Sequence, residues 1–127
     1  MFDPYLSAGE DWDMWLRIAR YFEIRGLNEV VSCIRLHDRN LTSRAGMMDQ
    51  AYQTILDKFF NQPDLPVHIR QLKNKARSKA KIAAGVLAAR RGDYKLSVIL
   101  CLQALRFQKF VPDAYNLLFR SIFRLSI

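Results

Sequence analysis

The sequence predicts a mainly α-helical fold with a small β component. Apolar residues recur at helical spacing over most of the 127 residues, whereas residues 22–27 and 30–36 carry the alternating or β-branched composition of strands. Half of the residues are hydrophobic and a quarter are charged, a balance that is typical of globular rather than disordered chains. The expected order is one helix, two short strands and four further helices.

Residues 10–21 are expected to form the first helix. Ser7 and Glu10 have the spacing of a capping box, in which the two side chains bind N–H groups at the helix start. Asp13 can pair with Arg17 one turn later. The stripe at helical spacing comprises Trp12, Trp15, Leu16 and Ala19. We expect Trp15 to pack in the core.

The two strands, residues 22–27 and 30–36, cannot form a stable sheet by themselves. They either add to a sheet in another part of a longer protein, or are covered tightly by the helices. Asp38, Arg39 and Asn40 then have the composition of a turn. The next helix can be capped by Thr42 or Ser43 and should stop before Pro63. Its expected inward stripe is Met48, Tyr52, Ile55, Leu56 and Phe59.

Three helices are expected in the remainder. A long helix should run from about residue 67 to residue 91, where Gly92 and Asp93 end it. Its expected inward residues are Ile69, Leu72, Ala76, Ala80, Ala83 and Leu87. Residues 94–108 are apolar on most sides, so this helix should lie between neighbours. Pro112 suits the first turn of a final helix, whose expected inward stripe is Tyr115, Leu118, Ile122 and Leu125.

The net charge of +8 is distributed unevenly. Residues 1–66 carry 7 Lys/Arg and 10 Asp/Glu, which gives −3, whereas residues 67–127 carry 13 Lys/Arg and 2 Asp, which gives +11. We therefore expect two parts, residues 1–62 and residues 63–127. No apolar run approaches the ~20 residues of a membrane span, and residues 1–4 lack the layout of a signal peptide. Cys33 and Cys101 are expected to be buried free thiols, which fits a reducing cytoplasm.

Three carboxylates and two tryptophans are concentrated in Gly9-Glu10-Asp11-Trp12-Asp13-Met14-Trp15-Leu16-Arg17. Together with Phe2-Asp3-Pro4-Tyr5-Leu6 and Ile34-Arg35-Leu36-His37-Asp38-Arg39-Asn40, this motif resembles the last part of the catalytic domain of family 2 glycosyltransferases. The resemblance covers residues 2–44. It implies the A-type glycosyltransferase fold, a Rossmann-like α/β domain. It also implies transfer of a sugar from a nucleotide-sugar donor to an acceptor hydroxyl, with inversion.

On this interpretation the chain is the C-terminal portion of such a domain, on the acceptor side, followed by a four-helix extension. The fragment is expected to be inactive alone, because the donor-binding half with its Asp-x-Asp metal motif would precede Met1. A divalent metal, Mg²⁺ or Mn²⁺, is implied for the full-length enzyme, with a glycan or lipid-linked acceptor. Asp11-Trp12-Asp13 also spells Asp-x-Asp, but lies in the acceptor-side motif and is not interpreted as the metal site.

The resemblance assigns roles to individual residues. Asp11 matches the family's catalytic base, with Glu10 beside it. His37 matches a histidine that faces the donor diphosphate and its metal, although an ordinary loop histidine is the alternative. The residues expected to contact substrate are Trp12, Asp13, Arg35 and Asn40. For the carboxylates, the alternative interpretation is helix capping and complementarity to the helix dipole.

The chemistry fits a carboxylate at a helix start. Inverting transfer needs a base to remove the proton of the acceptor hydroxyl, a contribution of ~10²–10⁴-fold. Backbone N–H groups hold such a carboxylate in its ionised form, which positions it well and makes it a weak base. The larger contribution would come from the metal and from dipoles that neutralise the leaving diphosphate.

The helix expected at residues 67–91 carries only cations among its charged residues, and four of them share one face: Arg70, Lys73, Arg77 and Lys81. The functional interpretation is contact with an anionic membrane surface or a phosphate-bearing acceptor. The alternative is a solvated face. No nucleic-acid partner is expected, because no recognition motif or interleaved aromatic residue accompanies the charge. The expected location is the cytoplasm, with a peripheral position at the inner face of the membrane as a variant.

A second resemblance concerns residues 84–104. With Gly92-Asp93-Tyr94 between two helices, this segment resembles a single degenerate tetratricopeptide-type helical hairpin. One such unit cannot form a peptide-binding solenoid. The competing hypothesis for the whole chain is therefore a non-catalytic helical module for protein interaction or membrane-surface binding.

Overall fold

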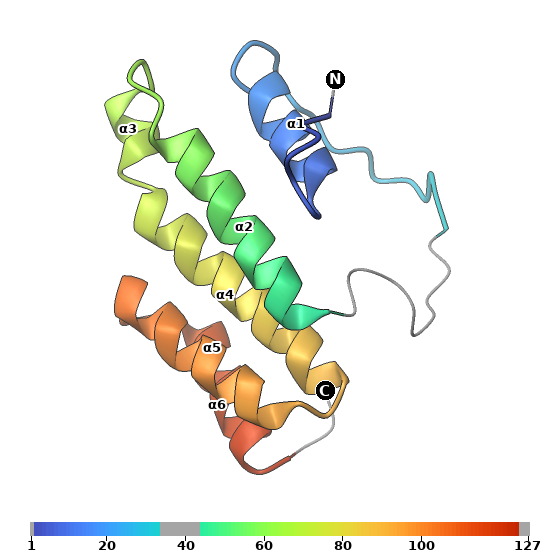
Figure 1. Cartoon of the computed structure of the whole chain (residues 1–127), viewed down its shortest axis with the longest axis vertical. Helices are drawn as coiled ribbons and strands as arrows, with labels where there is room; N and C mark the ends of the chain where they lie inside the picture. The colour runs from blue at the N-terminus through green and yellow to red at the C-terminus, as the bar shows by residue number, and fades with distance from the viewer. Residues whose placement is uncertain (1, 34–43, 125–127) are drawn as a thin grey trace.

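Helices dominate the part of the chain that the structure describes, which confirms the mainly α prediction. The computed structural model describes residues 2–33 and 44–124 (Figure 1). Its elements in chain order are α1 (Glu10–Ile18), α2 (Ala45–Phe60), α3 (Val67–Arg70), α4 (Lys73–Arg90), α5 (Tyr94–Phe107) and α6 (Pro112–Ile122). The first helix is thus shorter than expected, because the chain passes into turns after Ile18.

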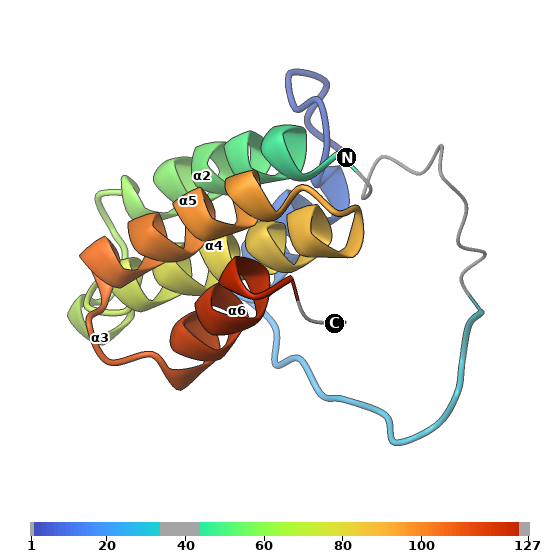
Figure 2. The same cartoon turned by 90° about the horizontal axis from the view of Figure 1, so that it is seen from below.

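The long helices α2, α4 and α5 lie side by side and run in alternating directions (Figure 1). The last helix, α6, packs against α5 and α4 (Figure 2). The first helix, α1, packs on α2, on the side away from α5 and α6. The helix that carries the acidic motif is therefore attached at one edge of the bundle.

The core crosses the boundary expected at residues 62/63. One cluster of buried residues joins Leu56 and Phe60 of α2 to Leu65 and to Ala80 of α4. α2 therefore packs with the helices of the C-terminal half. The division into a catalytic-domain portion at residues 1–62 and a helical extension at residues 63–127 stays a prediction.

Small residues allow α4, α5 and α6 to approach closely. A second cluster joins Ala89, Cys101 and Leu117, one from each helix. A Cβ atom on Gly85 would lie 3.1 Å from Leu117 Cδ2, so the backbone of α4 nearly touches α6 there. The buried alanines of these three helices are Ala80, Ala84, Ala88, Ala89, Ala104 and Ala114.

The turn between α4 and α5 forms as expected. Gly92 has a φ of 78°, and its N–H donates to the Ala89 carbonyl at 2.9 Å, while the Asp93 N–H donates to Ala88 at 3.0 Å. This pair of bonds satisfies carbonyls at the end of α4. The Asp93 side chain then accepts the Leu96 N–H at 3.0 Å and caps α5.

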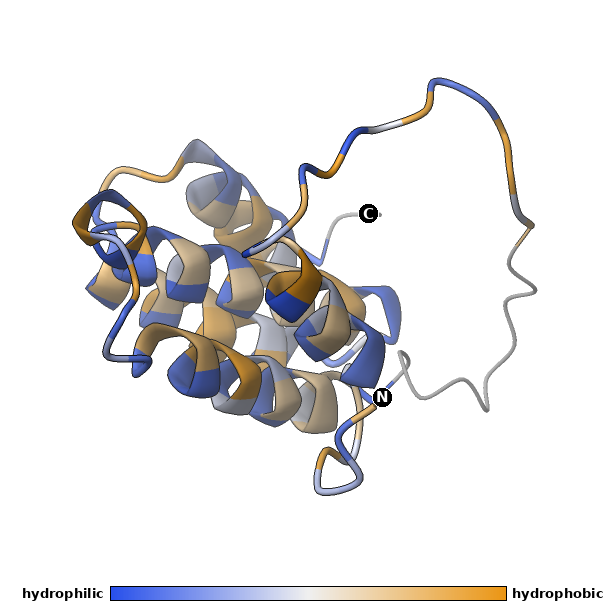
Figure 3. Cartoon of the chain, turned by 90° about the horizontal axis from the view of Figure 1, so that it is seen from above, coloured by the Kyte–Doolittle hydropathy of each residue, from blue (hydrophilic) through white to orange (hydrophobic). Residues whose placement is uncertain are grey.

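The expected strands are not found among residues 22–33. This segment is extended but belongs to no strand, and all of its side chains are exposed. Apolar and polar residues alternate along it, as Figure 3 shows. The composition favours a strand, but no other described segment offers a strand to pair with. Residues 34–36 of the second expected strand lie outside the described residues.

The helix expected at residues 67–91 is divided in two. The Leu72 N–H donates to the Ile69 carbonyl at 2.9 Å, a bond over three residues that ends α3 before α4 begins. The expected inward face is also displaced, because Ala80 is buried but Leu72 and Ala83 are exposed. The small residues of α4, centred on Gly85, form the packed face instead.

Two further expectations are corrected. α6 begins at Pro112 as expected, but it packs through Ala114, Leu117 and Ser121, so that Tyr115 and Ile122 remain exposed. Leu125 lies outside the described residues. Of the two free thiols, Cys101 is buried as expected and Cys33 is exposed, because its extended segment has nothing packed over it. Burial raises the pKa of the Cys101 thiol to about 11.

Candidate functional site

Gly9 places the acidic motif at the start of α1. It is the N-cap residue, with a φ of 74°, and a Cβ atom added to it would lie 2.9 Å from Ile55 Cδ1 of α2. The backbone therefore turns sharply against α2 before the helix begins. The expected capping box does not form, since no side chain caps this helix. The N-cap residue is Gly9, so Ser7 lies two residues too early in the chain to cap this helix.

A pocket of about 390 Å³ lies beside this helix start. Its lining residues are Phe2, Ala8, Gly9, Glu10, Asp11, Trp12, Met48 and Tyr52. The predicted residues Glu10, Asp11 and Trp12 therefore share one surface. α1 supplies the carboxylates and one aromatic ring, and α2 supplies the opposing wall.

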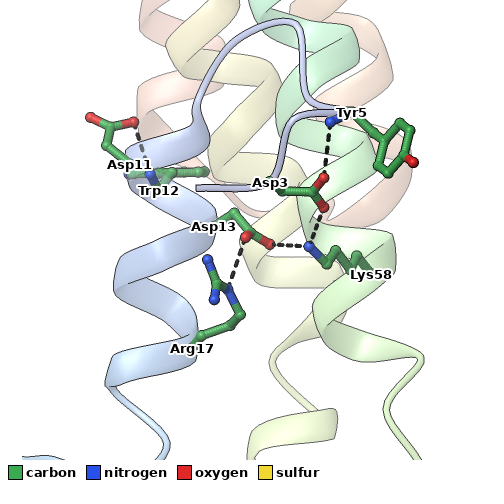
Figure 4. Close-up of polar contacts among 7 residues, drawn as sticks. All are labelled: Asp3, Tyr5, Asp11, Trp12, Asp13, Arg17 and Lys58. Carbon is green, nitrogen blue, oxygen red and sulfur yellow. Dashed lines mark hydrogen bonds and ion pairs between the residues drawn. The ribbon is translucent and has the colours of Figure 1, made fainter. Parts of the chain in front are cut away.

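Asp11 is exposed at this pocket. Its Oδ1 accepts the backbone N–H of Trp12 at 2.8 Å, so the helix start holds the carboxylate in place (Figure 4). A carboxylate among the first N–H groups of a helix also interacts favourably with the positive end of the helix dipole. Asp11 is accessible to a ligand and held in position, as a base for a hydroxyl group must be.

Two aromatic rings line the same pocket. The ring centroids of Trp12 and Tyr52 are 4.6 Å apart, and their planes are inclined by 40°. Trp12 remains 42 % exposed, so part of the residue is open to a ligand. Burial, with a smaller effect from the Asp11 carboxylate, raises the pKa of the Tyr52 hydroxyl. Sequence reasoning placed Tyr52 in the core stripe of α2 and missed its position beside the acidic motif.

Asp13 lies outside the pocket, although it was expected to contact substrate. It is only 4 % exposed. Its Oδ2 accepts from Arg17 Nε at 2.9 Å, which confirms the expected pair, and its Oδ1 lies 2.9 Å from Lys58 Nζ of α2 (Figure 4). The structure therefore engages Asp13 in joining α1 to α2, and its expected contact with substrate stays a prediction.

Lys58 joins Asp13 to the N-terminal segment. Its Nζ donates to Asp3 Oδ2 at 2.6 Å, and Asp3 Oδ1 accepts the Tyr5 N–H at 3.0 Å (Figure 4). The hydrogen bond from Lys58 holds the pKa of the Asp3 carboxyl below its ordinary value. The bonds to Asp3 and Asp13 raise the pKa of Lys58. This network fixes both segments that border the pocket, since Phe2 precedes Asp3 and Trp12 precedes Asp13.

Trp15 is 51 % exposed, which corrects the expectation that it packs in the core. Among the described elements α1 packs mainly on α2, so a side chain on another face of α1 remains in solvent. The exposed indole rings of α1 therefore lie at the edge of the bundle. Trp15 does not line the pocket.

The predicted loop residues Arg35, His37 and Asn40 lie outside the described residues. Within residues 2–33 and 44–124, no group of three or more His, Cys, Asp or Glu side chains gathers where it could hold a metal ion. The metal role of His37 and the metal of the full-length enzyme stay predictions.

The cationic face expected on residues 70–91 is turned toward α2. Arg77 forms an ion pair with Asp57, and Lys81 Nζ lies 2.7 Å from Asp49 Oδ2. The two other members of that face bind nearby oxygens: Lys73 binds Asn61, and Arg70 binds the carbonyls of Pro63 and Leu65. Arg77 and Lys81 thus join α4 to α2, whereas Arg70 and Lys73 bind the connection between α2 and α3. Contact of this face with an anionic membrane surface stays a prediction.

The comparisons with known proteins identify no relative. Neither protein-family models, nor curated proteins, nor solved structures give a match to this chain. Among the described residues, no helix combines the length and the apolar character that crossing a bilayer requires.

Proposed function

We propose that the chain is the acceptor-side portion of an inverting glycosyltransferase that uses a nucleotide-sugar donor. The observation that carries the proposal is the pocket at the start of α1. It combines an exposed, backbone-anchored carboxylate on Asp11 with the rings of Trp12 and Tyr52. A sugar acceptor needs both a base for its hydroxyl and a flat apolar surface for its ring.

In this function Asp11 accepts the proton of the acceptor hydroxyl as that oxygen attacks the anomeric carbon of the donor. Glu10 lines the same pocket and adds negative charge beside it. Trp12 and Tyr52 bind the apolar face of the acceptor ring. A divalent metal, Mg²⁺ or Mn²⁺, would supply positive charge to stabilise the leaving diphosphate. Another part of the full-length enzyme would hold that metal and the donor, and His37 is the metal ligand predicted for this chain.

The exposed apolar surface beside α1 supports this interpretation. In the extended segment that follows α1, the exposed large apolar residues are Tyr21, Phe22, Ile24, Leu27, Val30 and Val31. So many adjacent apolar side chains are typical of a surface that another protein part covers. In the proposed enzyme, the remainder of the catalytic domain covers them and supplies strands that pair with this segment.

The decisive experiment uses the full-length enzyme with Asp11→Asn. The substitution removes the base and keeps the shape of the side chain, so sugar transfer should fall by roughly 10²–10⁴-fold. Binding of the nucleotide-sugar donor, measured by calorimetry, should be retained. Asp113→Asn on α6, remote from the pocket, is the matched control and should leave transfer unchanged. Full transfer activity of the Asp11→Asn enzyme excludes the assignment.

The chain itself allows a second test, because its pocket should bind a saccharide without the donor. Titration with an oligosaccharide should change the tryptophan fluorescence, and Trp12→Ala should abolish the change. Trp15→Ala is the control, since Trp15 is also exposed but does not line the pocket. A response that depends on Trp15 and not on Trp12 contradicts the proposed acceptor site. The chain alone should show no turnover of a nucleotide sugar.

The competing function is a non-catalytic helical module for interaction with a protein or a membrane. The observation that supports it is the hairpin of α4 and α5, two helices joined by the turn at Gly92 and Asp93. Crosslinking of the intact chain in cell extract, with residues 67–127 as the contact region, would favour this function. It fails if residues 67–127 bind no partner and serve only to stabilise residues 1–66.

A further inference from the structure

The last helix presents apolar side chains on two different sides. One side, formed by Ala114, Leu117 and Ser121, is buried against α4 and α5. The second side remains in solvent although it is strongly apolar. Its members are Tyr115, Phe119, Ile122 and Phe123, which are 50 %, 57 %, 57 % and 60 % exposed.

These residues form one continuous surface. The spacing of Tyr115, Phe119 and Phe123 places them one above the other along the helix, and the ring centroids of Phe119 and Phe123 are 4.6 Å apart. The Tyr115 hydroxyl donates to the Lys109 carbonyl at 2.9 Å, which ties the preceding turn to the helix. That turn also carries Phe110, which is almost fully exposed. We call Phe110, Tyr115, Phe119, Ile122 and Phe123 the α6 aromatic face.

The charge around this face decides what can cover it. Lys109 lies in the turn that carries Phe110, and Arg124 follows Phe123 directly; both are exposed. Residues 67–127 carry a net charge of +11. The carboxylates of Asp57 and Asp49 on α2 form ion pairs with Arg77 and Lys81, so they do not neutralise the cations near α6.

An anionic lipid bilayer matches both properties. Its acyl boundary accepts aromatic and aliphatic side chains, and its headgroups attract cations at the rim of the apolar face. A second copy of the chain matches only the apolar property, because it would bring the same positive charge to the contact.

We propose that α6 is an interfacial helix that docks the chain on an anionic phospholipid surface. The α6 aromatic face enters the headgroup–acyl boundary, and Lys109 and Arg124 lie among the lipid phosphates. This contact is separate from the pocket beside α1, because that pocket is lined from α1 and α2 whereas α6 packs on α4 and α5. It is also separate from the cationic face of α4, which is turned toward α2.

The test measures binding of the intact chain to vesicles. Vesicles of phosphatidylcholine with phosphatidylglycerol should bind the chain at low ionic strength, and pure phosphatidylcholine should bind it far more weakly. Added salt should weaken the binding to the anionic vesicles. Phe119→Ser combined with Phe123→Ser should lower the affinity by about tenfold or more, because two aromatic side chains no longer enter the membrane. Lys109→Glu should lower it by several-fold.

Phe22→Ser is the matched control. It also removes an exposed phenylalanine, but from the segment beside α1, and it should leave vesicle binding unchanged. Circular dichroism should show the same helix content in all variants, which separates loss of binding from loss of folding. Sedimentation of the wild-type chain without vesicles should show a monomer.

Three results would overturn the proposal. The first is the absence of binding to anionic vesicles at low ionic strength. The second is vesicle binding that Phe119→Ser with Phe123→Ser does not change, which would place the contact elsewhere. The third is a dimer that this double substitution dissociates while vesicle binding is absent, which would make the α6 aromatic face an interface between two copies.

Discussion

Gly9 decides how the acidic motif meets the bundle. Its left-handed conformation and the closeness of Ile55 are separate constraints. The first concerns only the backbone, and the second concerns packing between the start of α1 and α2. A second glycine, Gly92, shares the backbone conformation but has open space at its Cβ position. Alanine substitutions at the two positions therefore distinguish the cost of backbone strain from the cost of steric contact.

Gly9→Ala should destabilise the chain more than Gly92→Ala. The left-handed conformation costs an alanine about 1–2 kcal/mol at either position. At Gly9 the new methyl group must also displace the side chain of Ile55, which should add about 1 kcal/mol. Free energies of unfolding from urea denaturation measure both. Equal values for the two variants would mean that Ile55 moves aside at no cost.

Lys58 holds three segments together, because it binds both Asp3 and Asp13. The Asp3 carboxyl has a lower pKa in the folded chain than its ordinary value of 3.8. Its contribution to stability is therefore complete above pH 3.8 and is lost as the pH falls through the lower, folded value. The raised pKa of Lys58 acts in the opposite sense, so its contribution is lost only as the pH rises above 10.5.

Lys58→Met should lower the free energy of unfolding at neutral pH by about 1–3 kcal/mol, since it leaves the buried Asp13 with Arg17 alone. The variant should also lose less stability than the wild type as the pH falls below 3.8, because Asp3 no longer has its partner. Urea denaturation across this pH range measures both effects. Lys95→Met on the exposed surface of α5 is the control. An unchanged acid profile would contradict the assignment of the Asp3 shift to Lys58.

The α2–α4 pair is held together by apolar and charged contacts. Leu56, Phe60 and Ala80 form the apolar part, and the ion pair of Asp49 with Lys81 joins the first part of α2 to the middle of α4. The side chains of Asp49 and Lys81 are both largely buried. Truncating one of them leaves a charge with poor access to water. The pair therefore favours this register of the two helices over others.

A double-mutant cycle on Asp49→Asn and Lys81→Met should give a coupling free energy of about 0.5–3 kcal/mol. The costs of the two single substitutions should add up to more than the cost of the double substitution, because each single substitution leaves one unpaired charge. The matched pair is Glu23 with Arg25, which is exposed and should show a coupling near zero. Additive effects at Asp49 and Lys81 would mean that water screens them as it does the exposed pair.

At the scale of the molecule, the chain is stabilised unevenly. α4 is in contact with α2, α5 and α6, whereas α1 packs on α2 and the segment after it is exposed. Regions with few buried contacts open most readily in the folded state. The part that carries the candidate site is thus the less stable part.

Hydrogen exchange should follow this division. Backbone amides of α4 and α5 should exchange slowest, α1 should exchange faster, and residues 19–33 should exchange fastest. If the proposed remainder of a catalytic domain covers residues 19–33, the same amides should be protected in the full-length enzyme. Mass spectrometry of both proteins would show this. Equal protection of α1 and α4 in the isolated chain would contradict the uneven packing.

The sequence by itself determined the features that depend on neighbouring residues. Pro63, Gly92, Asp93 and Pro112 marked where helices end or begin, because they act on their own backbone. The pair of Asp13 with Arg17 followed from helical spacing. Glu10, Asp11 and Trp12 could be predicted to lie together because they are adjacent in one helix start. Their role as an acceptor site stays a prediction.

The tertiary structure alone decided which faces are used and which distant residues meet. Alternating composition at residues 22–27 favours a strand, but a strand needs a partner. Several sides of α4 and α6 are apolar enough to pack. In the structure the small residues lie on the buried sides, because they allow the helices to approach most closely. The packing of α1 on α2 brings Tyr52 into contact with Trp12 and Lys58 into an ion pair with Asp13. Periodicity describes a helix in isolation, whereas burial and ion pairing depend on what lies opposite.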